Sequence, residues 1–131
     1  MNTASDVPSP EKTEVQILTE LCFGSMKVIG LSPKDQGHVF GHNIRSEKEL
    51  DELRQTMCKD AKPREMVLFS LIGELAIDLA KYCDADRTKM ERWLDTPDEI
   101  LGFNPRVMLI CGRSDQINRV RARLRSLVSN R

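Results

Sequence analysis

The residues in this chain of 131 that are best suited to bind a metal ion are two histidines close together in the sequence. His38 and His42 are four residues apart, a spacing that puts two imidazoles on one face of a helix. Gly41 lies between them, however, and no third ligand is near in the sequence. The pair therefore predicts the polar edge of a turn, and we expect no metal site.

Two pairs of carboxylates have the spacing that acid–base catalysis can use. They are Asp84 with Asp86, and Asp95 with Asp98. Both pairs lie beside expected helix starts, where a carboxylate is stabilised by the helix dipole and caps free amides. The chain also shows no nucleophile with an evident base, no glycine-rich phosphate cradle and no cofactor motif. The sequence therefore predicts a protein that is not an enzyme and that needs no cofactor.

The four cysteines are spread far apart and form no C-x-x-C pair. They are Cys22, Cys58, Cys83 and Cys111. This spacing argues against a zinc site and against a disulfide framework, and it favours a reducing cytoplasm as the compartment of the protein. Three of them lie in or beside apolar helical stretches, where a free cysteine packs as a small hydrophobic residue.

The formal net charge is zero, but the charges are distributed unevenly along the chain. From Arg106 to the end there are seven arginines against the single acid Asp115, so the part before Arg106 is acidic. This asymmetry suggests an anionic partner for the basic end, or self-association of the acidic part with the basic part.

These side chains must be positioned by helices, because apolar residues recur at helical spacing and no alternation of period two is sustained. Helix starts are signalled at Ser9 and Pro10, Ser32 and Pro33, Ser46 with Glu49, Asn104 and Pro105, and Ser114 or Asp115; further helices are expected over 65–82 and 87–94. The predicted fold class is all-α. We expect a disordered leader over 1–8, a helical module over 9–60 and a second helical domain over 61–131.

The expected helix over 65–82 is apolar around most of its circumference. Its polar residues, Ser70, Glu74, Asp78 and Lys81, fall on one narrow stripe at spacings of four, four and three. Such a helix must be covered on most sides by its own domain or by a second subunit, so we expect a homodimer. No apolar run approaches the roughly 20 residues that a membrane span needs, so no membrane partner is expected.

The segment 93–105 carries the densest local signals, and it begins with the only tryptophan, Trp93. Residues 96–99 have the pattern of a capping box with proline at the first helical position. Gly102 then breaks the chain before a second helix start at Pro105. The segment predicts a compact helical corner with a core tryptophan.

This segment resembles the C-terminal toxin-binding domain of the Xre/MbcA/ParS antitoxin family. The matching positions are Trp93, Leu94, Thr96, Pro97, Leu101, Gly102 and Pro105. The resemblance implies that an Xre-like helix-turn-helix module, with 30–41 as its second helix and turn, precedes the toxin-binding domain. It also implies a partner toxin of the RES fold, which attacks NAD, and an antitoxin C-terminus that lies near the active site of that toxin.

If the matching residues build a structural platform, the contacts with the toxin come from the basic end beyond it. The residues expected to bind the partner are Arg119, Arg123, Arg125, Asn130 and Arg131. Guanidinium groups match the geometry of phosphate and carboxylate groups, which suits a pocket that binds a dinucleotide. The expected function is that of an antitoxin of a type II toxin–antitoxin pair. From the residues alone, the alternative is a solvated basic face with no partner.

Operator DNA is a further expected partner, through which the protein would regulate its own operon. Arg45 and Lys48 are the residues expected to position the module on DNA. The expected recognition helix departs from the family, because residues 46–52 hold four acids against one lysine. Carboxylates oppose the electrostatic attraction that dominates DNA affinity. The alternative function is that of a phage- or host-derived regulator or inhibitor that reuses the fold to bind nucleic acid or another protein.

Overall fold

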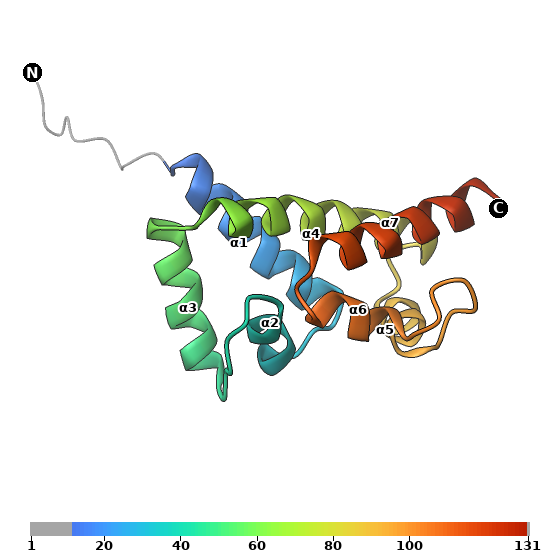
Figure 1. The fold of residues 1–131 in the computed structure, drawn as a ribbon, viewed down its shortest axis with the longest axis horizontal. Coiled ribbons are helices and arrows are strands. Elements are labelled where there is room, and N and C mark those ends of the chain that lie inside the picture. Colours follow the sequence, from blue (N-terminus) through green and yellow to red (C-terminus); the bar gives the residue numbers. More distant parts are fainter. Residues whose placement is uncertain (1–11, 131) are drawn as a thin grey trace, which may run out of the picture.

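The computed structural model describes residues 12–130, which contain seven helices (Figure 1). They are α1 (Glu14–Val28), α2 (Pro33–Val39), α3 (Glu47–Lys59), α4 (Pro63–Tyr82), α5 (Arg87–Asp95), α6 (Pro105–Ile110) and α7 (Ser114–Ser129). No strand occurs in this range, so the predicted all-α class is confirmed. Among these helices none is both long and apolar enough to cross a membrane. The expected leader 1–8 and the residues Ser9, Pro10 and Arg131 lie outside the described residues.

Hydroxyl side chains cap the N-termini of three helices. Thr13, Ser32 and Ser46 each accept a hydrogen bond from the amide three residues further on, at 3.1, 3.1 and 3.2 Å. Each bond satisfies an amide that a helix start leaves without a partner. The starts predicted at Ser32 and Ser46 are therefore confirmed, and so is the start at Pro105, which follows Asn104 in the cap position.

Three other predictions about helix starts or their caps are wrong. Lys12 and Thr13 are not helical, so the helix expected from Ser9 begins only at Glu14, where the Thr13 hydroxyl caps it. The last helix begins at Ser114, as expected, but Arg113 is in its cap position, so neither Ser114 nor Asp115 caps it. The Asp115 carboxylate instead pairs with the Arg113 guanidinium at 3.1 Å.

The third error concerns the capping box expected over 96–99. No helix begins there, and 97–104 form a loop between α5 and α6. The Thr96 hydroxyl donates a hydrogen bond to the carbonyl of Arg92 at 2.6 Å, so Thr96 completes α5 and does not cap a new helix.

One apolar core joins the helices, with α4 at its centre between α1 and α7 (Figure 1). Leu75 and Leu79 of α4 are fully buried, as is Met26 of α1. Complete burial of such a side chain stabilises a fold by about 1.5–3 kcal/mol. Because α1 packs along α4, the core spans residues from both expected domains, 9–60 and 61–131.

The face of α7 that packs on α4 is the stripe that the sequence predicted. Ile117, Val120 and Leu124 are fully buried, while Leu127, near the end of the helix, is partly exposed. Apolar residues at this spacing form one face of a helix, so the pattern alone places α7 on the core.

Arginines of α7 form ion pairs with the acidic residues in the polar stripe of α4. Arg121 Nη2 lies 2.8 Å from a Glu74 carboxylate oxygen, and Arg125 Nε lies 3.3 Å from an Asp78 carboxylate oxygen. The Arg121 side chain is only 11 % exposed. The helices of the same chain thus cover most of α4, although Ile77 stays 57 % exposed.

Candidate protein-binding surface

The loop 97–104 and the first turn of α6 present three exposed apolar side chains. Ile100 is 68 % exposed, Phe103 is 59 % exposed and Val107, on α6, is 51 % exposed. We call these three residues the apolar loop surface. Three such side chains on one short segment make it a candidate interaction site, whereas isolated ones are ordinary on any protein surface.

Asp98 fixes the conformation of this loop. Its Oδ1 accepts hydrogen bonds from the amides of Ile100 and Leu101 at 2.9 and 3.0 Å. Its own amide donates to the carbonyl of Phe103 at 3.2 Å, and the amide of Gly102 donates to the Asp98 carbonyl at 2.8 Å. Gly102 has a φ of +84°, which an L side chain rarely adopts. Leu101 is buried, so it anchors the loop on the core while its neighbours face solvent.

Two arginines of α7 hold the loop from the side. Arg123 Nε donates to both carboxylate oxygens of Asp98, at 3.1 and 3.0 Å. Arg119 Nη2 donates to the carbonyl of Leu101 at 3.4 Å, and the rest of this side chain is exposed. The loop is therefore braced on α7, and Arg119 places a positive charge at its edge.

The Asp98 carboxylate is only 11 % exposed, which raises its pKa through desolvation. The hydrogen bond from the Leu101 amide and the Arg123 guanidinium outweigh desolvation, so the net shift of the Asp98 pKa is downward. A carboxylate whose pKa is lower in the folded protein stabilises the fold fully above its unfolded pKa of about 4. This contribution is lost as the pH falls through the lowered value.

We therefore expect the unfolding midpoint to fall on acidification below about pH 4, and Asp98→Asn to reduce that dependence. Thermal unfolding of both proteins between about pH 2 and 7 measures the effect. Glu99→Gln is the matched control, because Glu99 is an exposed carboxylate of the same loop. An equal reduction by both variants would show that Asp98 has no special part in the stability of the loop.

Trp93 does not lie in the core, contrary to the prediction. The ring is partly exposed and packs edge to face on Tyr82, with the centroids 6.3 Å apart. It lines an open hollow together with Lys89, Arg92 and Leu127. The tryptophan thus covers the rim of the core between α5 and the end of α7.

Trp93→Ala is expected to lower the free energy of unfolding by about 2 kcal/mol, less than the roughly 3–5 kcal/mol of a fully buried aromatic residue. Urea unfolding measures it. A loss above about 4 kcal/mol would mean that the ring is a core element, and a loss near zero would mean that it contributes no packing at all.

The other residues that match the antitoxin motif divide into buried and exposed positions. Leu94, Leu101 and Pro105 are buried; Thr96, Pro97 and Gly102 are exposed. The buried three belong to the apolar core or its edge, and the exposed three face solvent.

The residues predicted to bind a partner do not gather at one place. Arg119 and Arg123 contact the loop, whereas Arg125 extends to Asp78 of α4 at 3.3 Å. Asn130 is exposed and lines the hollow beside Trp93. Arg131 lies outside the described residues.

The two residues predicted to contact DNA lie elsewhere. Arg45 and Lys48 are exposed at the start of α3, at the opposite end of the molecule from the loop (Figure 1). The connection 40–46 between α2 and α3 is longer than the roughly three- or four-residue turn of a helix-turn-helix.

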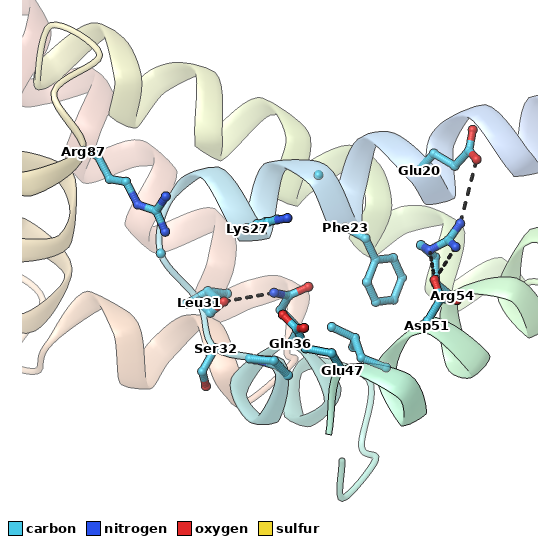
Figure 2. A pocket seen from close by; sticks show the side chains of 14 residues that line it. Glu20, Phe23, Lys27, Leu31, Ser32, Gln36, Glu47, Asp51, Arg54 and Arg87 are labelled. Carbon is cyan, nitrogen blue, oxygen red and sulfur yellow. Dashed lines mark hydrogen bonds and ion pairs between the residues drawn. The ribbon is translucent and has the colours of Figure 1, made fainter. Parts of the chain in front are cut away.

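A hollow between α1, α2 and α3 is lined by acids and bases in equal number (Figure 2): Glu20, Glu47 and Asp51 against Lys27, Arg54 and Arg87. Arg54 forms a hydrogen bond with Asp51 and reaches Glu20 at 3.8 Å. Deeper in the hollow, the Gln36 amide donates to the carbonyl of Leu31 at 2.9 Å. Because charges of opposite sign line the hollow in equal number, they produce little net electrostatic field with which to attract an ionic ligand.

The residues with potential metal or redox chemistry lie apart from one another. His38 and His42 are both exposed, and no cluster of three or more potential metal ligands occurs within residues 12–130. The cysteine thiols are free, and burial raises the pKa of Cys22 far above its ordinary value, which makes its thiolate inaccessible. Asp86 caps α5 by accepting from the amide of Lys89 at 3.2 Å, as expected for a carboxylate at a helix start.

No family model matches this chain, and no curated protein matches it. The resemblance to the antitoxin family therefore rests on the sequence patterns alone.

Proposed function

We propose that this chain is a protein-binding inhibitor of the antitoxin type, which contacts its partner through the apolar loop surface. The observation that carries the proposal is the exposure of Ile100 and Phe103 on a loop that Asp98 and Arg123 hold in one conformation. A rigid loop loses little conformational entropy on binding. More of the free energy gained by burying its exposed side chains therefore contributes to the binding affinity.

The composition of the surface fits a protein partner. Binding energy at protein interfaces concentrates in a few aromatic or apolar anchors and arginines surrounded by a polar rim. Phe103 and Ile100 would supply the anchors, and Arg119, at the edge of the loop, the arginine.

The class of partner rests on the resemblance of the segment 93–105 to the antitoxin family. The loop lies in the middle of this segment, and Arg119 adds a guanidinium that suits a carboxylate or phosphate site. A RES-type toxin that consumes NAD is accordingly the proposed partner.

Nucleic acid is the less favoured partner. Arg121, Arg123 and Arg125 form ion pairs with acids of the same chain, so much of the basic charge of α7 is compensated. The start of α3 places Glu47 beside Lys48. Operator binding through a helix-turn-helix would need a DNA contact that overcomes this acidic surface.

Capture of partners from the lysate of the native cell tests the proposal. Tagged wild-type protein is expected to retain one enzyme in stoichiometric amount, identified by mass spectrometry and by NAD consumption after its release. A parallel capture with Phe103→Glu should lose that enzyme. Recovery of nucleic acid alone, or of the same proteins by both baits, would contradict the proposal.

A further inference from the structure

The outward face of α1 carries an apolar stripe that the described residues leave exposed. Ile17, Leu21 and Val28 are 45, 59 and 56 % exposed, and Gly24 lies among them. Their spacing of four, three and four residues is that of the contact face in a pair of packed helices. The inner face of the same helix already packs on α3 and α4, so the stripe is a second, separate contact face.

Gly24 is an unusual choice for the middle of a helix, because glycine weakens helices and favours other conformations. A Cβ added at this position would meet nothing within 4 Å. The described part of the chain therefore does not require glycine here. A glycine that lies on an exposed apolar helix face does, however, allow a large side chain of another molecule to approach closely.

The geometry points to a second copy of this chain on the stripe, with the two α1 helices antiparallel about a two-fold axis. The positions 17, 21, 24 and 28 are symmetric about a point between Cys22 and Phe23. The axis at this point puts Leu21 of each copy opposite Gly24 of the other. At both symmetry-related positions, the leucine side chain then fills the space over the glycine. Ile17 then lies opposite Val28 of the second copy.

The charges beside the stripe fit the same arrangement. Glu20 and Lys27 lie on one flank of α1, where both line the hollow shown in Figure 2. Antiparallel pairing about this axis puts Glu20 level with Ser25 of the second copy, two residues or about 3 Å along the helix from Lys27 of that copy, so the two long side chains can reach each other. Symmetry repeats this contact of opposite charges. Isologous interfaces require this self-complementarity.

The other flank of the stripe supplies further apolar surface. Ile77 of α4 is 57 % exposed and lines a shallow hollow with Ala76 and Ala80, next to Leu21 and Val28 of α1. A second copy seated on α1 would cover Ile77 as well, which enlarges the buried apolar area beyond one helix. This dimer does not rest on the proposed function, because the stripe and the apolar loop surface belong to different helices.

The oligomeric state of the full chain tests the inference. Sedimentation equilibrium of the wild type is expected to give a dimer at micromolar concentration, and Leu21→Glu is expected to weaken it by roughly 100-fold or more. Val67→Glu is the matched control, because Val67 is 52 % exposed on α4 but lies beside Arg64 and Gly112, away from the stripe. A monomeric wild type, or an equal loss with Val67→Glu, would overturn the inference.

A charge exchange tests the antiparallel register. Glu20→Lys and Lys27→Glu should each weaken the dimer by about 10-fold, and the double variant should recover most of the wild-type affinity. Since Glu20 also pairs with Lys12 at 2.8 Å and with Arg54 at 3.8 Å, circular dichroism must show unchanged helicity in each variant. Failure of the double variant to recover the dimer, with helicity unchanged, would overturn this register.

Discussion

Phe103→Glu is expected to weaken the complex with the captured partner protein by roughly 30- to 1,000-fold, which corresponds to about 2–4 kcal/mol. Phe103 is 59 % exposed on a loop whose position is fixed by Asp98, so its side chain is available without rearrangement. A carboxylate in its place would be buried at the interface without a partner, which adds a desolvation cost to the lost apolar contact. Titration calorimetry with the purified partner measures the change.

The same variant should keep the stability of the wild type within about 0.5 kcal/mol, because an exposed side chain contributes little to the core. Val67→Glu is the control for a charge placed at a similarly exposed apolar position on another helix, and it should leave affinity unchanged. If both variants bind as tightly as the wild type, the apolar loop surface has no part in recognition. A loss of affinity accompanied by a large loss of stability would show that Phe103 is structural.

Gly112→Ala is expected to lower the free energy of unfolding by about 3 kcal/mol or more. Gly112 follows α6, has a φ of +71° and lies against the backbone of Val39, which comes from the opposite half of the chain. A Cβ there would lie 2.1 Å from the Val39 carbonyl oxygen, so one of the two backbone segments would have to move. Such a displacement separates α6 from α2, two helices that pack against each other.

Gly41→Ala separates the two causes of this destabilisation, which are the backbone strain at positive φ and the steric overlap with Val39. Gly41 has a φ of +78°, but a Cβ there would meet nothing within 4 Å. Its replacement should therefore cost only the backbone strain, about 1–2 kcal/mol. Chemical unfolding of both variants is the measurement. Equal losses would mean that the close approach between Gly112 and Val39 relaxes at no cost.

Two helix starts could be predicted from the sequence because both partners of the capping hydrogen bond are close together in it. Ser32 and Ser46 stand three residues before the amides that they cap, so the sequence holds both partners of each hydrogen bond. The segment 96–99 shows the limit of such signals. Thr96 has the pattern of a cap, but its hydroxyl completes the preceding helix, while Asp98 orders the next residues as a loop. The pairing of Asp98 with Arg123 favours that loop, and local patterns do not show this contact.

The candidate site could be predicted only in part. The arginines of α7 are conspicuous in the sequence, but their roles depend on acids that are distant along the chain. Arg123 pairs with Asp98, and Arg121 pairs with Glu74, which is 47 residues away. Whether an arginine is free for a partner is therefore decided by tertiary structure. Among the predicted contact residues that the structure describes, Arg119 is the one that lies beside the loop and is exposed.

The exposed residues Ile100 and Phe103 were not predicted, because apolar residues ordinarily indicate the core. A signal was present nevertheless: both lie within a stretch bounded by Pro97 and Pro105 and interrupted by Gly102, where a helix long enough to bury them has no room. Apolar residues in such a stretch are more consistent with an exposed loop than with a core helix.

Inhibition of the captured enzyme by this chain tests the central claim most directly. NAD consumption is measured while the enzyme, at a fixed concentration, is titrated with wild-type protein and, separately, with Phe103→Glu. We predict that the wild type abolishes activity at one chain per active site and that the variant needs a large excess. Full activity in the presence of excess wild type, or equal inhibition by both proteins, would contradict an antitoxin that acts through this loop.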